Sequence, residues 1–128
     1  MICRFRLGGV LMACVLVTAG GAYAASVTNV SVQEARQMLG SRSKDPTFTV
    51  LDVRTPAEFS AGHLPGAVNV DALASDFEHR LRSLDKNTSY LVYCRSGNRS
   101  QAAVRAMERL GFRSIFHMTA GMLGWDTQ

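Results

Sequence analysis

The most informative segment of the sequence is Tyr90-Leu91-Val92-Tyr93-Cys94-Arg95-Ser96-Gly97-Asn98-Arg99-Ser100. Its first four residues are apolar and β-prone, which is typical of a buried strand, and this strand runs directly into Cys94. Ser96-Gly97-Asn98 is a turn sequence. A helix is predicted from about Ser100, because apolar residues then recur with helical spacing until Gly111 supplies a stop. The stretch therefore predicts a strand, a tight loop and a helix, with a cysteine where the strand ends.

Further strands and helices alternate on both sides of this stretch. The patterns predict a helix from Ser31 to about Gly40, a strand over Phe48–Asp52, a short helix from Thr55 to Gly62, a strand over Ala67–Val70, a charged helix over Ala74–Leu84 and a last strand over Ile115–Met118. This alternation predicts an α/β fold with a parallel sheet and helices on both faces. Ligands of such sheets bind beyond the carboxyl ends of the strands, where Cys94 is expected.

The beginning of the chain has the pattern of a secretory signal. Arg4 and Arg6 precede an apolar run over residues 7–18, and Ala22-Tyr23-Ala24 offers small residues at the cleavage positions. We expect cleavage before Ala25, which would leave a single domain over residues 25–128 in the periplasm or outside the cell. The alternatives are an uncleaved membrane anchor or a lipidated cysteine.

Loss of residues 1–24 changes both the charge and the cysteine content. Two basic residues leave, so the net charge falls from +4 to +2, and no basic stripe remains that would indicate a nucleic-acid partner. Cys3 and Cys14 leave as well, so Cys94 is the only cysteine of the mature chain. A lone thiol in an exported protein cannot form an internal disulfide, so it is either a buried apolar residue or a reactive group.

The loop after Cys94 has three features of an anion site. Successive amides and a helix N-terminus can converge on one point, and Gly97 permits backbone conformations that a side chain would obstruct. Arg95 and Arg99 favour the thiolate of Cys94. No acidic residue lies between Tyr90 and Met107, so the expected partner of the two arginines is an anionic ligand. The alternative is that both arginines are merely solvated and the cysteine is buried.

Three motifs resemble the rhodanese family of sulfurtransferases, and together they span nearly the whole mature chain. Leu51 to Phe59 with Gly62 to Asn69 resembles the family's first signature, Cys94 to Ser100 its active loop, and Gly121 to Trp125 its C-terminal signature. The resemblance implies a five-stranded parallel sheet. Together with the signal pattern and the single domain, it makes the chain similar to exported single-domain members of the family. It also implies that Cys94 takes sulfur from thiosulfate, or a polysulfide, as a persulfide and passes it to cyanide, a thiol or a protein acceptor.

The resemblance assigns roles around Cys94. Neither a metal nor an organic cofactor is implied. Asp52 would brace the active loop, although it could simply cap the turn before Thr55, and Arg54 could pair with Asp52, Glu58 or the site. The residues expected to bind the donor are Arg95, Ser96, Gly97, Asn98, Arg99 and Ser100.

Two other functions remain open. A phosphatase or arsenate reductase of the cell-cycle phosphatase type needs an arginine separated from the cysteine by five residues, and this chain has Ser100 at that position, whereas Arg99 is separated from Cys94 by four. A binding module without turnover is the second alternative, because a fold alone does not guarantee activity. His63 is expected to make a structural hydrogen bond, and His79 and His117 lack ligands at metal-binding spacing.

Overall fold

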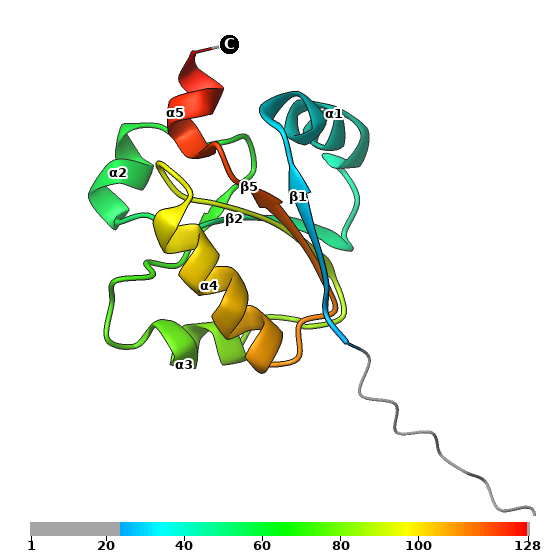
Figure 1. Cartoon of the computed structure of the whole chain (residues 1–128), viewed down its shortest axis with the longest axis vertical. Coiled ribbons are helices and arrows are strands. Elements are labelled where there is room, and N and C mark those ends of the chain that lie inside the picture. Colours follow the sequence, from blue (N-terminus) through cyan, green and yellow to red (C-terminus); the bar gives the residue numbers. More distant parts are fainter. Residues whose placement is uncertain (1–23, 128) are drawn as a thin grey trace, which may run out of the picture.

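The computed structural model describes residues 24–127, and Figure 1 shows the arrangement of their helices and strands. The signal segment predicted over residues 1–24 therefore lies outside the described residues, apart from Ala24. The elements are β1 (Ser26–Val30), α1 (Val32–Arg42), β2 (Phe48–Asp52), α2 (Pro56–Ala61), β3 (Val68–Asn69), α3 (Phe77–Arg82), β4 (Ser89–Tyr93), α4 (Asn98–Arg109), β5 (Ser114–Met118) and α5 (Gly121–Asp126).

The strands form one parallel sheet in the order β1-β5-β4-β2-β3, which confirms the predicted five-stranded α/β fold. β4 is the central strand, and its last four residues are all buried, as its continuous apolar sequence predicts. From β2 the chain continues outward to β3, whereas from β4 it continues in the opposite direction to β5. The carboxyl ends of β2 and β4 therefore form a topological switch point, where ligands of such sheets bind.

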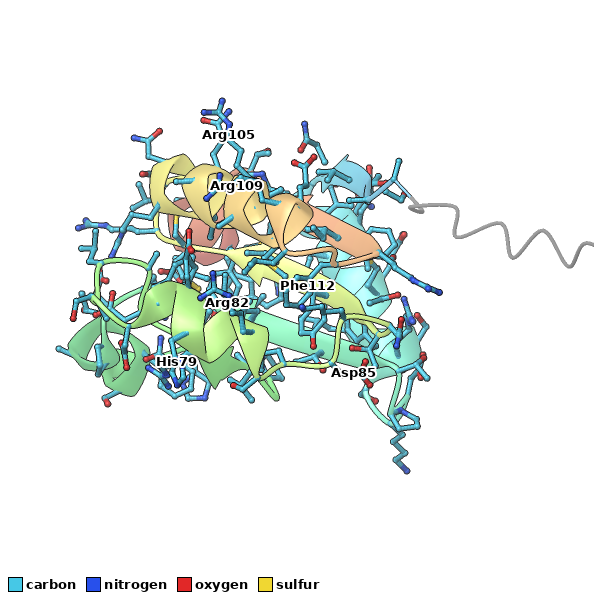
Figure 2. The ribbon with its side chains drawn as sticks, turned by 90° about the horizontal axis from the view of Figure 1, so that it is seen from below. His79, Arg82, Asp85, Arg105, Arg109 and Phe112 are labelled. Atoms are coloured by element: carbon cyan, nitrogen blue, oxygen red, sulfur yellow. The ribbon has the colours of Figure 1, made fainter. Side chains whose placement is uncertain are left out.

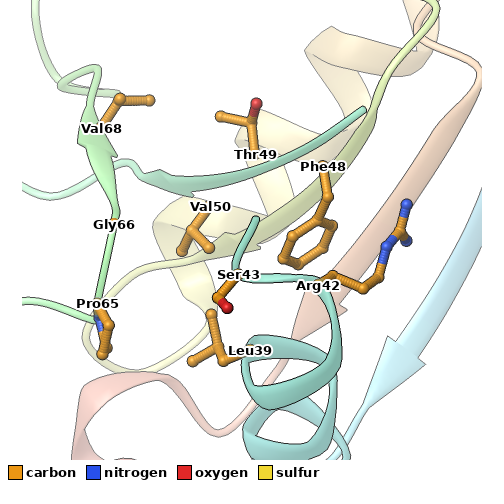
Figure 3. Close-up of a pocket in the computed structure, with 9 residues that line it drawn as sticks. All are labelled: Leu39, Arg42, Ser43, Phe48, Thr49, Val50, Pro65, Gly66 and Val68. Carbon is orange, nitrogen blue, oxygen red and sulfur yellow. The ribbon is translucent and has the colours of Figure 1, made fainter. Parts of the chain in front are cut away.

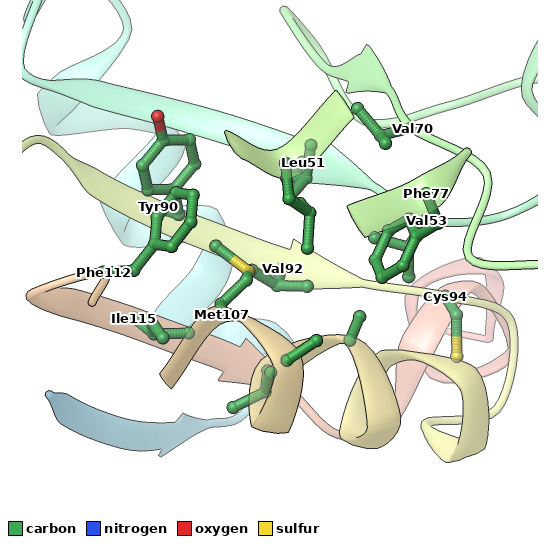
Figure 4. Close-up of a cluster of buried hydrophobic side chains, with 14 residues drawn as sticks. Leu51, Val53, Val70, Phe77, Tyr90, Val92, Cys94, Met107, Phe112 and Ile115 are labelled. Atoms are coloured by element: carbon green, nitrogen blue, oxygen red, sulfur yellow. The ribbon is translucent and has the colours of Figure 1, made fainter. Parts of the chain in front are cut away.

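Helices cover both faces of the sheet, as predicted. Successive side chains of each strand point to opposite faces, so each face of the sheet has its own core. Tyr90 and Val92 of β4 pack in the core under α3 and α4, together with Met107 and Phe112. Leu91 and Tyr93 pack on the other face, in the core that includes residues of α1. Figure 4 shows the first core, with Cys94 at the end of β4 beside the start of α4.

The helices α3 and α4 lie side by side on one face, and charged side chains cover their outer surface (Figure 2). Glu78 of α3 forms ion pairs with Arg82 at 3.5 Å and with Arg109 of α4 at 3.2 Å. All three side chains are about half exposed or more, so these pairs contribute little to stability.

Two elements were not predicted from residue patterns. β1 has the polar sequence Ser-Val-Thr-Asn-Val and only Val30 of it is buried, so it carries no apolar periodicity; its pairing with β5 along five residues defines it. α5 has only six residues, too few for a periodic signal.

Two predicted helices have different bounds in the structure. The helix predicted over Ala74–Leu84 is shorter, at Phe77–Arg82, and α4 begins at Asn98 rather than Ser100. No helix between residues 24 and 127 is long and apolar enough to cross a membrane.

Candidate active site

Cys94 follows the central strand and starts the loop that leads into α4. Its side chain is 1% exposed. The amide of Gly97 donates a hydrogen bond to Sγ at 3.1 Å, and Ser100 Oγ lies 3.2 Å from Sγ. Gly97 adopts a φ of 97°, a left-handed conformation that turns the loop back toward the sulfur. The sulfur is therefore enclosed by its own loop.

Hydrogen bonds to this sulfur favour the thiolate. Burial raises the pKa of Cys94, but hydrogen bonds from the Ser100 hydroxyl and from the amides of Ser100, Gly97 and Ser96 outweigh it and hold the pKa below its ordinary value. The thiolate is thus stabilised chiefly by oriented dipoles in a buried position, where such dipoles act strongly. This arrangement fits an anionic nucleophile that is ready before any ligand binds.

The turn between β5 and α5 supports the loop from behind. The first amides of α5 donate to loop carbonyls: Met122 N to Cys94 O at 2.9 Å and Leu123 N to Arg95 O at 3.1 Å. These donors would otherwise be unpaired at a helix N-terminus. A Cβ atom on Gly121 would collide with the Arg95 carbonyl, and one on Gly97 would collide with the Thr119 carbonyl. Glycine at both positions is therefore required by this close approach.

Asp52 and Arg54 form a buried ion pair at the end of β2. Asp52 is 0% exposed and Arg54 is 6% exposed. The Arg54 guanidinium donates to both carboxylate oxygens at 2.7–3.1 Å, and the hydroxyl of Tyr93 donates to Asp52 Oδ2 at 2.6 Å. Of the three partners considered for Arg54, the structure therefore selects Asp52. The carboxylate contacts the active loop through Tyr93, the residue before Cys94, rather than directly.

Arg99 differs from the sequence prediction. It was expected to lack an acidic partner, but Glu58 binds it with two hydrogen bonds, at 2.7 and 2.9 Å. The prediction was wrong because Glu58 is distant in sequence. Glu58 lies on α2, which follows β2 and places its carboxylate beside Arg99. The hydrogen bond from Arg99 lowers the pKa of Glu58 to about 2, despite the opposing effect of burial. The pair therefore contributes to stability above the ordinary carboxyl pKa, and this contribution is lost as pH falls toward 2.

Glu58 also forms the predicted capping box with Thr55, whose amide donates to Glu58 Oε2 at 2.9 Å. One carboxylate thus fixes the start of α2 and the side chain of Arg99 together. The ion pair links the segments that follow β2 and β4 across the switch point, because Glu58 belongs to α2 and Arg99 to α4.

Three of the other predicted donor-binding residues lie on the outer side of the loop, and one is buried. Arg95, Ser96 and Asn98 are exposed, whereas Ser100 is completely buried. A polar pocket of about 260 Å³ adjoins the loop, and its lining consists of Asn29, Ser96, Gly97, Asn98, Gln101, His117 and Thr119. Three of the six predicted loop residues, Ser96, Gly97 and Asn98, therefore line a polar pocket beside the enclosed sulfur.

A second pocket, of about 300 Å³, lies away from Cys94 (Figure 3). Its lining includes Phe48 and Thr49 at the amino end of β2 and Leu39 and Arg42 at the end of α1. Phe48 is in register with Ser89, the first residue of β4, whereas Cys94 follows the last. This pocket is thus at the opposite end of the sheet from the thiol.

The histidines have different surroundings. His63 stacks on Phe59 and its Nδ1 lies 2.9 Å from the Phe59 carbonyl oxygen, so the predicted structural hydrogen bond is present. Between residues 24 and 127, no cluster of three or more potential ligands could hold a metal ion. His117 was missed: it is 6% exposed and its Nε2 lies 2.7 Å from Ser100 Oγ. The sequence feature that could have identified His117 is a polar residue near the carboxyl end of a buried strand.

Comparison with known proteins agrees with this arrangement. Residues 31–128 match the rhodanese-like domain family. The chain belongs to this family. The thiosulfate sulfurtransferase GlpE of Pseudomonas putida is 34% identical over 90 residues, which cover 70% of this chain and 78% of GlpE. GlpE of Tolumonas auensis is 29% identical, over 77% of this chain and 87% of that protein.

Some relatives are much longer. The chain spans 52% of YrkF of Bacillus subtilis, at 31% identity, so it matches about half of that protein. Among solved structures, a rhodanese-related protein of Thermoplasma volcanium has a TM-score of 0.64 at 29% identity and covers 78% of this chain and 91% of its own. The human single-domain sulfurtransferase TSTD1 has a TM-score of 0.66 at 21% identity, over 80% of this chain and 98% of its own, which shows a shared fold.

Loss of Arg54 should destabilise this rhodanese-like domain strongly. Arg54→Met leaves the Asp52 charge buried without its cation, which we expect to lower the free energy of unfolding by about 3–5 kcal/mol. Urea denaturation measures the change. Arg82→Met is the matched control, because it breaks an exposed ion pair and should cost below about 1 kcal/mol. Equal losses in the two variants would contradict a structural role for the buried pair.

Proposed function

We propose that the protein transfers sulfane sulfur from a small anionic donor, such as thiosulfate or a polysulfide, through a persulfide on Cys94. The observation that carries the proposal is the enclosed sulfur of Cys94, whose pKa is lowered by loop hydrogen bonds although burial opposes this. The acceptor would be a thiophile such as cyanide, a thiol or a protein thiol. The names of the GlpE relatives support the same chemistry.

The reaction has two balanced half-reactions. The Cys94 thiolate attacks the outer sulfur of thiosulfate, a new S–S bond forms, and the old S–S bond breaks with its electron pair leaving on sulfite. The acceptor then attacks the outer sulfur of the persulfide, and the electron pair returns to Cys94 as thiolate. The amide of Gly97 and the hydroxyl of Ser100, which contact the sulfur in the free protein, would stabilise the anion in each state.

The arginines divide into two roles. Arg95 is exposed in the loop and would attract the dianionic donor to its mouth. Arg99 is held by Glu58, so its charge is partly neutralised and its geometry fixed. We propose that Arg99 acts on the donor mainly through this fixed position of the loop, with Ser96, Gly97, Asn98 and Ser100 supplying the hydrogen-bonding groups.

The phosphatase alternative is weaker than sulfur transfer. Such an enzyme needs a free arginine to grip a tetrahedral oxyanion. Here Ser100 occupies the required position, and Arg99, one residue earlier, already binds a carboxylate. A binding module without turnover remains the second candidate, since it could keep the same fold and thiol.

The test of the function is thiocyanate formation from thiosulfate and cyanide. The wild-type protein should show turnover, and Cys94→Ser should abolish it, because a serine hydroxyl cannot form the persulfide. Circular dichroism of the variant serves as the control for folding. If Cys94→Ser keeps the wild-type rate, the proposed nucleophile is wrong; a folded wild-type protein inert with thiosulfate and polysulfide alike favours the binding module.

Substitutions of Arg95 and of Glu58, the partner of Arg99, should separate the roles of the two arginines. Arg95→Ala should raise the KM for thiosulfate about two- to fivefold at low salt, with little change in kcat, because an exposed charge contributes below about 1 kcal/mol. The effect should shrink at high salt. Glu58→Gln tests Arg99 directly: if Arg99 gripped the donor, its release would lower KM. We expect a higher KM or lower kcat instead, because the loop loses its anchor.

We also propose that the protein is exported and cleaved before Ala25. The support is the basic, apolar and small-residue order of residues 1–24. Expression of the full chain in a Gram-negative host, followed by fractionation and N-terminal sequencing, tests it. The expected product is periplasmic and begins at Ala25. A membrane-bound product with its N-terminus intact would indicate an anchor instead.

A further inference from the structure

His117 is a buried titratable side chain that the two half-reactions do not themselves require. It lies on β5, in register with Asn29 of β1 and Val92 of β4. Its Nε2 lies 2.7 Å from Ser100 Oγ, and that oxygen lies 3.2 Å from Cys94 Sγ. The three side chains come from β5, α4 and the loop after β4, and they form one hydrogen-bonded chain that ends on the sulfur.

The Ser100 hydroxyl sits at a branch point of this chain. It has a single hydrogen, and its oxygen lies near His117 Nε2, Cys94 Sγ and, at 3.1 Å, the Gly97 carbonyl. That carbonyl already accepts the Gln101 amide at 3.0 Å. A hydrogen directed at a thiolate gains a charge-assisted bond, which is stronger than a bond to a neutral carbonyl.

The imidazole decides where this hydrogen goes. If Nε2 carries a hydrogen, it donates to Ser100 Oγ, and the hydroxyl can point at Cys94 Sγ. If Nε2 is bare, it accepts the hydroxyl hydrogen and the thiolate loses a donor. The tautomer of His117 is therefore coupled to the stability of the thiolate.

We infer that His117 is a positioning residue for Cys94: its Nε2–H donates to Ser100 Oγ and thereby directs the Ser100 hydroxyl at the sulfur. In the free protein, this contact between the Ser100 hydroxyl and the sulfur stabilises the thiolate. The same contact would stabilise the persulfide anion, a consequence that rests on the proposed function.

The surroundings of His117 suit this role. Burial lowers the pKa of the imidazole, so the ring is neutral at neutral pH and holds one hydrogen. The pocket that it lines is formed by uncharged groups of β1, the active loop, α4 and the turn after β5, namely Asn29, Ser96, Gly97, Asn98, Gln101 and Thr119. The pocket beside His117 is therefore lined by polar groups that carry no charge.

The two arginines of the active loop and α4 would remain unchanged when His117 is replaced. Arg95 lies in the loop, and Arg99 on α4 interacts electrostatically with the thiolate while bound to Glu58 of α2. A shift in the titration of Cys94 on replacement of His117 alone therefore reports the Ser100 contact.

The pH dependence of Cys94 alkylation by iodoacetamide tests the inference without any sulfur donor. His117→Leu should raise the apparent thiol pKa so that about tenfold less thiolate is present at low pH, the effect of losing one hydrogen bond to an anion. His117→Gln, which keeps an N–H donor, should stay near wild type. His63→Leu removes an exposed histidine with no contact to Cys94 and should change nothing.

A double-mutant comparison shows whether His117 acts through Ser100. Ser100→Ala should shift the pKa at least as much as His117→Leu, and the double variant should shift it no further than Ser100→Ala. Additive shifts would overturn the inference, as would a folded His117→Leu variant with wild-type titration. Because alkylation needs no donor, these results are independent of whether the protein transfers sulfur.

Nitrogen NMR of the wild-type imidazole provides a test that needs no variant. The expected spectrum at neutral pH shows a neutral His117 with hydrogen on Nε2 and a bare Nδ1. A spectrum with hydrogen on Nδ1 and a bare Nε2 overturns the inference, even if His117→Leu fails to fold.

Discussion

The structure depends on one constraint: the loop after β4 must turn into α4 while its polar groups point at the sulfur of Cys94. The left-handed conformation of Gly97 makes the turn, and the amide of that residue and the hydroxyl of Ser100 reach Sγ at 3.1 and 3.2 Å. Such a loop exposes its carbonyl groups on the outside, and the first amides of α5 donate hydrogen bonds to them. Gly121 allows the necessary close approach.

Charge near the thiol is balanced within the protein. Asp52 is neutralised by Arg54, and Glu58 by Arg99, so neither carboxylate opposes a thiolate. Both acidic residues come from β2 or the helix after it, whereas the thiol comes from β4. The switch point of the sheet is thus held together by interactions that also leave the loop geometry fixed before a ligand arrives. This is preorganisation of the kind that stabilises developing anions.

Much of this could be predicted from the sequence, because apolar runs such as Phe48–Asp52 and capping residues such as Thr55 leave local signals. β1 left none, since an exposed edge strand is defined by its partner rather than by its own pattern. The same reason explains the error over Arg99: its partner Glu58 is 41 residues away, and no local pattern reports it. The contact of His117 with Ser100 likewise exists only once β5 is packed beside α4.

Intact mass spectrometry can measure whether Cys94 carries sulfur. The protein is measured alone, after incubation with thiosulfate, and again after cyanide. We expect a gain of one sulfur atom, located on Cys94 by peptide mapping, and its loss with thiocyanate formation when cyanide is added. If Cys94 is reduced and alkylatable, yet gains no sulfur from thiosulfate or polysulfide, the protein does not transfer sulfur through this thiol.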